Sequence, residues 1–245
     1  AVLGDVKESL AALLPLVEAK SHEAWHNEFK EKYKIELESV INDELNPKGE
    51  GISMGETIEM INKHSNGDAI MVSDVGQHQM FTCRYSKFNQ SKSNITSGGL
   101  GTMGFALPAA IGAKMGQPDR EVVAIIGDGG FQMTIQELGT IFQTRVPVKI
   151  VVLNNEFLGM VRQWQQLFFD KRYASTEMIN PNFIAIAEGY YIKAKKVTKR
   201  EDLDAAVAEM LASKEAYFLE VMVEKENNVF PMIPTGASVS DIRLS

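Results

Sequence analysis

Two short apolar runs organise the chain. Residues 122–126 and 148–153 are rich in β-branched side chains and are followed by the polar residues Asp128 and Asn155. Runs of this kind are typical of buried parallel strands. Residues 131–142, between them, have apolar side chains at helical spacing. The unit therefore predicts strand, turn, helix and strand, with both strand ends at one sheet edge, where α/β proteins bind ligands.

The remaining hydrophobic pattern predicts further strands and helices around this unit. Strands are predicted at residues 69–73, 191–197 and 217–223, and helices at residues 5–20, 53–64, 105–115, 157–169, 181–188 and 201–212. Residues 84–97 are polar and predict a loop, and the tail at 230–236 predicts irregular structure. Strands that alternate with helices predict an α/β fold, a three-layer sandwich with a mainly parallel sheet.

A break at residues 46–51, rich in Gly, Pro and Asn, predicts a boundary between two parts of the chain. We expect residues 1–49 to form a helical tail or linker and residues 50–245 to form the main domain. The chain begins with Ala1 and shows no signal-peptide pattern, so we expect that it starts inside a longer protein.

Net charge, cysteine content and the length of the apolar runs limit the classes of protein to which the chain can belong. The net charge of -7 argues against a general nucleic-acid-binding surface. The single cysteine, Cys83, excludes an internal disulfide framework and fits a reducing compartment. No apolar run is long enough to span a bilayer, so no membrane partner is expected.

The turn Gly127-Asp128-Gly129 carries the clearest chemical signal. Glycines on both sides of a carboxylate let the backbone and the acid approach a ligand together. The N-terminus of the following helix favours an anion. An anion next to the Asp128 carboxylate would need a cation between the two negative charges. The Asn155 amide oxygen and a turn carbonyl just beyond it complete a set of hard oxygen ligands that suits Mg²⁺. The alternative is a plain Asp-Gly turn.

Gly99, Gly101 and Gly104 have the spacing of a dinucleotide fingerprint, which leaves nicotinamide binding open as an alternative. A fingerprint should follow a hydrophobic strand, whereas residues 91–97 are polar, and this argues against it. A glycine-rich turn with only a packing role is the other alternative.

Four further side chains are candidates by position. Gln77 and His78 follow the first predicted strand, where they could donate hydrogen bonds to a phosphate or be simply solvated. Met160 and Trp164 are four residues apart on a helix that starts after Asn155. That spacing is typical of core positions, and the place of the helix makes a pocket wall the alternative.

Longer motifs give the sequence a family resemblance. They are residues 76–80, 96–112, 153–155, 158–164 and 231–236. Together they resemble the catalytic subunit of acetolactate synthase, a thiamine-diphosphate-dependent enzyme. The resemblance runs from about residue 50 to the C-terminus and corresponds to the C-terminal, thiamine-diphosphate-binding third of that subunit, which implies the thiamine-diphosphate-binding fold. Residues 1–49 resemble the end of the central domain and the linker that leaves it.

The resemblance implies a role for each matching position. It implies Mg²⁺ ligands at Asp128, the Asn155 side chain and the Phe157 carbonyl, and diphosphate contacts at Gln77, His78, Gly129 and Gly130. It implies that Gly101 and Met103 hold the aminopyrimidine through their backbone groups, with the Met103 side chain beneath the bent cofactor. Met160 and Trp164 are implied to line the substrate pocket, and Trp164 and Thr235 to contact sulfonylurea-type herbicides.

The family's reaction decarboxylates pyruvate and joins the two-carbon unit to pyruvate or 2-oxobutanoate, in branched-chain amino acid biosynthesis. The resemblance implies thiamine diphosphate and Mg²⁺ as cofactors, with FAD in the full-length enzyme. It implies a homodimer or higher homo-oligomer and a small regulatory subunit as partner. A bacterial cytoplasmic location is expected, with organelle import left open.

One departure from the family is large. The activating glutamate of these enzymes comes from a pyrimidine-binding domain, and no stretch of this chain resembles that domain. We therefore expect the chain alone to hold a half-site without carboligase activity. Another thiamine-diphosphate-dependent decarboxylase or oxidase, and a non-catalytic cofactor-binding module, are the alternatives.

Overall fold

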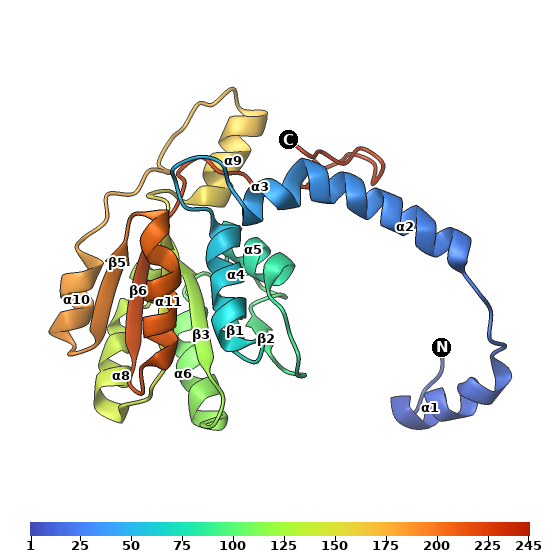
Figure 1. The fold of residues 1–245 in the computed structure, drawn as a ribbon, viewed down its shortest axis with the longest axis horizontal. Helices are drawn as coiled ribbons and strands as arrows, with labels where there is room; N and C mark the ends of the chain where they lie inside the picture. The colour runs from blue at the N-terminus through green and yellow to red at the C-terminus, as the bar shows by residue number, and fades with distance from the viewer.

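The computed structural model describes residues 1–245 and is built on a six-stranded sheet in which every neighbouring pair is parallel (Figure 1). The strand order is β2-β1-β3-β4-β6-β5. The strands are β1 Ile70–Ser73, β2 Asn94–Thr96, β3 Val122–Gly127, β4 Lys149–Asn154, β5 Lys193–Val197 and β6 Tyr217–Met222. Every residue of the central strands β3 and β4 is buried, so the predicted central unit and the parallel sheet are confirmed.

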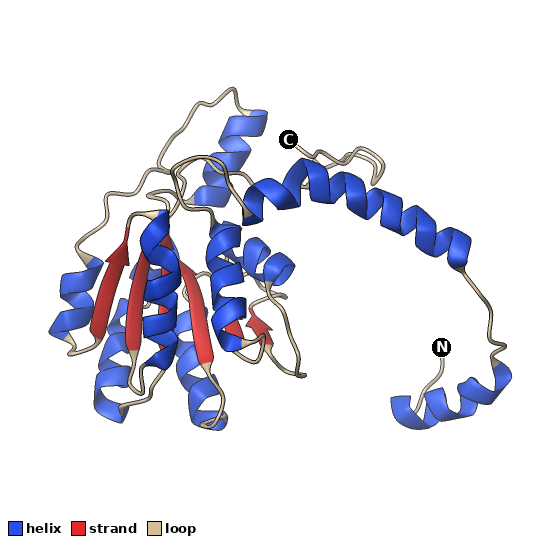
Figure 2. Cartoon of the chain, in the orientation of Figure 1, coloured by secondary structure: helices blue, strands red, loops and turns tan.

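Helices cover both faces of the sheet (Figure 2). One face packs against α4 Met54–Ser65, α5 Gln77–Tyr85 and α11 Leu203–Ala212. The other face packs against α6 Ala106–Gly116, α7 Asp128–Met133, α8 Leu138–Thr144 and α10 Phe183–Gly189. Each face buries its own apolar cluster, of 22 and 20 residues, so neither is left to solvent. The predicted three-layer sandwich is confirmed.

The start of α4 shows how the local sequence fixes an element. Ser53 Oγ accepts a hydrogen bond from the Glu56 backbone N–H at 2.9 Å, and the Glu56 carboxylate accepts one from the Ser53 N–H at 2.7 Å. This reciprocal pair is the predicted capping box, which satisfies two N–H groups that a helix start would otherwise leave unpaired.

Two predictions of secondary structure were wrong. The predicted loop at 84–97 contains the edge strand β2 and the last turn of α5. Strand β2 is hydrogen-bonded only to β1 and is not fully buried, so it needs no apolar run. The predicted helix at 131–142 is interrupted, because the backbone of Thr134 leaves the helical region and a 3₁₀ turn at Ile135–Glu137 separates α7 from α8.

The N-terminal residues form a helical arm that leads away from the sheet (Figure 1). It consists of α1 Val6–Leu13, a 3₁₀ turn Leu14–Leu16, α2 Glu23–Glu36, a π-helical turn Leu37–Ile41 and α3 Asn42–Leu45. Trp25 on α2 is 60% exposed, whereas Val40 and Glu44 are buried against the domain. No helix of the chain, in the arm or elsewhere, combines the length and the apolar character needed to cross a bilayer.

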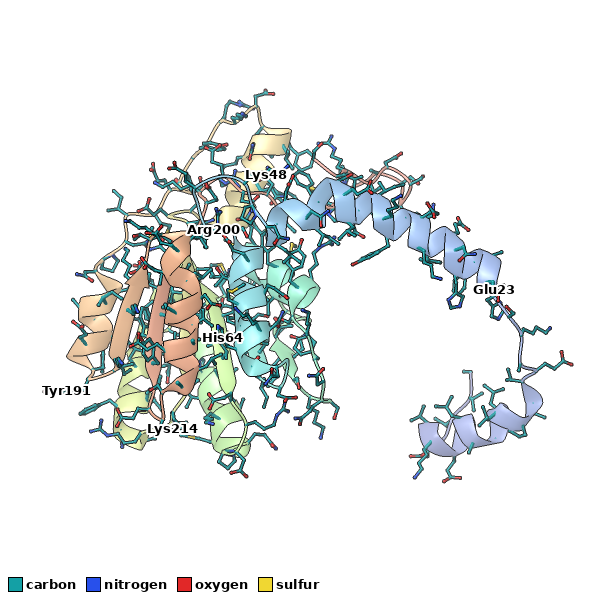
Figure 3. The ribbon with its side chains drawn as sticks, in the orientation of Figure 1. Glu23, Lys48, His64, Tyr191, Arg200 and Lys214 are labelled. Atoms are coloured by element: carbon teal, nitrogen blue, oxygen red, sulfur yellow. The ribbon has the colours of Figure 1, made fainter.

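The segment that joins the arm to the sheet is held at the carboxyl edge, where the strands end. The Arg200 guanidinium donates to the Gly49 and Gly51 carbonyls and pairs with the Glu56 carboxylate at 2.9 Å. Figure 3 shows Arg200 and Lys48 at this edge, with Tyr191 and Lys214 at the opposite, amino edge. The predicted break at 46–51 therefore lies directly over the ends of the strands.

Candidate functional site

The pocket opens where the sheet reverses its winding. Strand β1 leads into α5 on one face, and its neighbour β3 leads into α7 on the other. Loops that leave adjacent strands toward opposite faces create a crevice, the usual ligand site of open α/β sheets. The pocket at this point is lined by the ends of β3 and β4 and by the turns that follow β1, β3 and β4.

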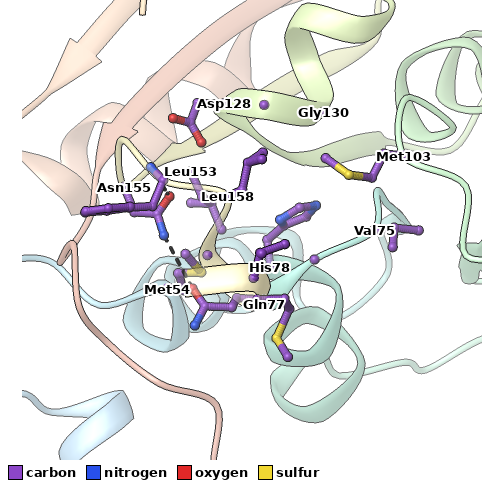
Figure 4. A pocket seen from close by; sticks show the side chains of 17 residues that line it. Met54, Val75, Gln77, His78, Met103, Asp128, Gly130, Leu153, Asn155 and Leu158 are labelled. Carbon is purple, nitrogen blue, oxygen red and sulfur yellow. Dashed lines mark hydrogen bonds between the residues drawn. The ribbon is translucent and has the colours of Figure 1, made fainter. Parts of the chain in front are cut away.

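Most of the predicted site residues line this one pocket (Figure 4). They are Gln77, His78, Met103, Asp128, Gly129, Gly130, Asn155, Phe157 and Met160. Gly101 and Trp164 are not part of its wall. Met54, Val75, Leu153, Leu158 and Val161 line it as well, and the sequence analysis did not single them out.

Asp128 lies at the junction of β3 and α7 and is only 1% exposed. Its Oδ2 accepts a hydrogen bond from Asn180 Nδ2 at 2.7 Å. Burial raises the pKa of Asp128 to about 6, because a low-dielectric surrounding disfavours the charged form. A cation bound beside the carboxylate would relieve this penalty.

Asn155 and Phe157 supply the other oxygen atoms expected at a metal site. Asn155 Oδ1 accepts from the Phe157 N–H at 3.2 Å, and Asn155 Nδ2 donates to Gln77 Oε1 at 3.3 Å, which fixes the orientation of the amide. The Phe157 carbonyl accepts no hydrogen bond within the chain. No group of three His, Cys, Asp or Glu side chains could hold a metal. A cation here would therefore rely on one carboxylate, one amide, one carbonyl and oxygens of a ligand, a set that suits Mg²⁺.

His78 is buried in the pocket wall, which overturns the alternative that it is solvated. Its ring fits between two glycines: a Cβ atom built on Gly76 or on Gly127 would lie 2.9 Å from the ring. Burial lowers the pKa of His78 to about 4, so the imidazole is neutral at pH 7. Its Nε2 has no hydrogen-bond partner, and a buried polar atom without one is a group that a ligand can satisfy.

Gln77 connects the pocket to the segment that follows β6. Its Nε2 donates to Gln163 Oε1 at 2.9 Å and to the Asn227 carbonyl at 2.8 Å, and its Oε1 accepts from Asn155. Both amide hydrogens are thus used within the chain. The structure shows Gln77 orienting Asn155, and its direct contact with a diphosphate stays a prediction.

Sequence reasoning missed Asp74, which holds the loop containing Met103. This carboxylate is fully buried, and it accepts hydrogen bonds from the Gly104 N–H at 2.9 Å and the Ala106 N–H at 2.8 Å. Gly104 has a φ of 82°, a region that glycine enters readily. The only sequence signal was an acid directly after the first predicted strand.

The same contact decides against a dinucleotide site. The prediction that no strand precedes Gly99–Gly104 was wrong, because β2 ends at Thr96 and α6 begins at Ala106. The start of α6 is nevertheless occupied by the Asp74 carboxylate. A pyrophosphate needs that helix N-terminus free, and a buried negative charge there would repel it.

Sequence reasoning also missed Asn180. Its Nδ2 donates to Asp128 Oδ2 at 2.7 Å and to Asn154 Oδ1 at 3.1 Å, and its Oδ1 accepts from Gln132 at 2.9 Å. Asn180 thus orients the carboxylate from outside the pocket. No spacing signal could have found it, because it lies 52 residues from Asp128 in the sequence.

The two helix residues predicted for the substrate pocket differ in position. Both belong to α9, Gly159–Phe168. Met160 lines the pocket, whereas Trp164 is 45% exposed and packs edge-on against Phe168 with ring centroids 6.0 Å apart. In this chain Trp164 is therefore partly exposed and is not part of the pocket wall, and its role toward substrate stays a prediction.

Comparison with known proteins gives the family. A profile described as "Thiamine pyrophosphate enzyme, C-terminal TPP binding domain" matches residues 74–221, which include both β3 and β4 and the turns that follow them. The chain belongs to this family. The predicted thiamine-diphosphate-binding fold is thereby confirmed, thiamine pyrophosphate being another name for the same cofactor.

The relatives found by sequence comparison include acetolactate synthases, the enzymes that the sequence motifs resemble. The chain is 40% identical over 236 residues to the acetolactate synthase large subunit of Lactococcus lactis subsp. lactis (strain IL1403), a match that covers 96% of this chain and 40% of the relative. It is 39% identical over 258 aligned positions to chloroplastic acetolactate synthase 2 of Nicotiana tabacum, a match that covers 98% of this chain and 38% of the relative. The chain thus spans about two fifths of the length of these relatives.

A solved structure shares the fold. It is the thiamine diphosphate-dependent 4-hydroxybenzoylformate decarboxylase of Rhodococcus jostii RHA1, with a TM-score of 0.67 and 27% sequence identity. The similarity covers 73% of this chain and 34% of the decarboxylase. The sheet and its helices therefore have the arrangement found in part of a thiamine-diphosphate-dependent enzyme.

Proposed function

We propose that the pocket binds the diphosphate end of thiamine diphosphate through Mg²⁺. Asp128, the Asn155 amide oxygen and the Phe157 carbonyl would be the protein ligands of the metal. The observation that carries this proposal is their convergence at the reversal point of the sheet, beside the unpaired Nε2 of His78. The family match over residues 74–221 supports the same cofactor.

The residues present fit a diphosphate. His78 can donate a hydrogen bond to a phosphate oxygen, and the backbone N–H groups of Gly129 and Gly130, which line the pocket, would donate to it as well. A Cβ atom on Gly159 would lie 2.1 Å from Gln77 Oε1, so a side chain there would displace the Gln77 amide. The pocket wall thus combines polar donors with tightly packed backbone.

The other end of the cofactor would lie near the loop at 98–105. Gly101 and Met103 would hold the aminopyrimidine through backbone groups, with the Met103 side chain beneath the cofactor. Thiamine diphosphate, when bound, supplies a nucleophilic carbon and an electron sink for decarboxylation of a 2-oxo acid. The apolar side chains of Leu158 and Met160 would exclude water from that carbon, and Met160 and Trp164 would face the substrate.

We infer that the chain is the diphosphate-binding part of an acetolactate synthase that acts on pyruvate and 2-oxobutanoate. About 40% identity to such subunits over nearly the whole chain supports this. The same proposal includes FAD as a cofactor of the full-length enzyme, a homo-oligomeric assembly, a small regulatory subunit as partner and a bacterial cytoplasmic location. Residues 1–49 would be the linker from a central domain, and residues 50–245 the diphosphate-binding domain.

The proposal is tested by a thermal-shift comparison of ligands together with an activity assay. Thiamine diphosphate with Mg²⁺ is expected to raise the melting temperature of the 245-residue chain, and NAD is expected to leave it unchanged. Pyruvate should yield no acetolactate, because the chain holds only a half-site. A shift with NAD and none with thiamine diphosphate would overturn the cofactor assignment, and acetolactate formation would overturn the half-site.

A further inference from the structure

Asp74 is a buried charge that the proposed binding mode does not use. It directly follows β1 and has no exposed surface. Its Oδ1 accepts from the Val75 and Gly104 N–H groups, each at 2.9 Å, and its Oδ2 accepts from the Ala106 N–H at 2.8 Å. No lysine or arginine pairs with it, so backbone N–H groups compensate its charge.

The contact with Ala106 gives the carboxylate a defined partner. Helix α6 is 11 residues long, and its own N-cap, Phe105, provides no side-chain hydrogen bond. Asp74 supplies that cap from 32 residues away. A carboxylate is favoured at a helix N-terminus, because the aligned peptide dipoles place partial positive charge there.

Three parts of the pocket wall meet at this carboxylate. The loop with Met103 is bonded to it through Gly104. A Cβ atom on Gly130 would lie 2.7 Å from Asp74 Oδ1, so the turn after β3 rests directly on it. Its negative charge also acts on the neighbouring ring of His78. Asp74 therefore touches or faces both the diphosphate end and the Met103 end of the pocket.

We propose that Asp74 is a positioning residue that fixes the Met103 loop relative to the Gly129–Gly130 turn, and so sets the span between the two ends of the bound cofactor. This inference rests on the proposed function. It implies that an isosteric replacement of Asp74, which keeps its bulk against Gly130, weakens binding of a ligand that needs both ends far more than binding of a ligand that needs only the diphosphate end.

The substitution Asp74→Asn tests this with little change of shape. An amide has one oxygen, so its NH₂ group must face at least one of the three backbone N–H groups, and the loop must shift. Each hydrogen bond to the aminopyrimidine that the displaced loop no longer makes corresponds to up to about tenfold in affinity. Asp204→Asn is the matched control, because Asp204 pairs with Lys63 and His64 on the surface of α11.

The experiment measures calorimetric affinities of the 245-residue chain for thiamine diphosphate and for inorganic diphosphate, both with Mg²⁺. Asp74→Asn is expected to weaken thiamine diphosphate binding about tenfold or more and to change inorganic diphosphate binding less than about twofold. The control should change neither. Equal loss of both ligands by a folded variant, or no loss of thiamine diphosphate, would overturn the inference.

Two further measurements keep the result unambiguous. Gly104→Ala displaces the same loop and keeps Asp74, since its Cβ atom would lie 3.1 Å from Thr134 Cγ2 at a strained φ. It should show the same selective loss, and it decides the question if Asp74→Asn does not fold. If the unsubstituted chain binds neither ligand with Mg²⁺, the proposed function itself is wrong, an outcome distinct from failure of the variants.

Discussion

The two edges of the sheet are built in opposite ways. At the amino edge long side chains close the structure: Lys149 Nζ donates to the Ser213 and Glu215 carbonyls, each at 2.8 Å, and Lys114 Nζ donates to the Arg120 carbonyl at 2.6 Å. At the carboxyl edge glycines stand where side chains could lie, and a pocket remains.

The comparison separates buried polar groups that are paired within the chain from buried polar groups that the proposed ligand would pair with. Lys149 has its partners within the chain. Asp128 has one neutral amide partner and a raised pKa, and His78 keeps an unpaired nitrogen. Substitutions at the amino edge should therefore change folding, and those at the carboxyl edge should change binding.

The largest effect is expected from Asp128→Asn. The variant keeps a hydrogen-bond acceptor for Asn180 and loses the charge that would bind Mg²⁺. Mg²⁺-dependent affinity for thiamine diphosphate should fall about a hundredfold or more, since one of few protein ligands is gone. The melting temperature should not fall, because burial of the carboxylate is itself unfavourable. Calorimetry and a thermal melt check both, and unchanged affinity would remove Asp128 from the metal site.

Lys149→Met should give the converse result. Two hydrogen bonds from a buried ammonium group are lost, which should cost about 2–4 kcal/mol of unfolding free energy. Cofactor affinity should be unchanged at temperatures where the variant is folded. Urea denaturation followed by calorimetry measures the two quantities, and a loss of affinity without a loss of stability would contradict the division between the edges.

Asn180→Ala should weaken Mg²⁺-dependent binding about tenfold, as is typical when the partner of a metal ligand is removed. The matched control is Asn182→Ala, two residues away, where Asn182 Oδ1 caps α10 by accepting from the Ala185 N–H at 3.1 Å. The control should cost about 1 kcal/mol of stability and no affinity. Equal affinities for the two variants would show that Asn180 does not orient Asp128.

The smallest effect on cofactor binding is expected at Glu44, a buried acid at the carboxyl edge but outside the pocket. Asn227 Nδ2 donates to it at 2.9 Å, and burial raises its pKa from 4.5 to about 7. Because the folded pKa is the higher one, Glu44 disfavours folding increasingly as the pH rises from about 4.5 through 7. Glu44→Gln should therefore gain up to about 3 kcal/mol of unfolding free energy at pH 8 and nothing below pH 4.5. Urea melts at the two pH values measure this, and a gain independent of pH would contradict it.

The central strands and the Asp128 turn could be predicted because their signals are local. A buried strand requires a run of apolar residues, and Gly127-Asp128-Gly129 is contiguous. Strand β2 could not be predicted in the same way, since an edge strand is specified by its partner β1 and not by its own hydrophobicity.

The supporting residues of the site depend on distant contacts. Asp74 reaches Gly104 across 30 residues, and Asn180 reaches Asp128 across 52. The burial of His78 depends on the absence of side chains at both Gly76 and Gly127. Such roles follow from how the strands are ordered in the sheet, which the hydrophobic pattern along the chain does not specify.

The most direct test of the metal-linked cofactor site is calorimetric titration of the 245-residue chain with thiamine diphosphate, once with Mg²⁺ and once with the metal chelated. We expect saturable binding with one site per chain when Mg²⁺ is present, and an affinity lower by at least about tenfold when it is removed. Equal affinity in the two titrations would contradict the Mg²⁺-dependent diphosphate site at Asp128, Asn155 and Phe157. The absence of binding in both titrations would contradict it as well.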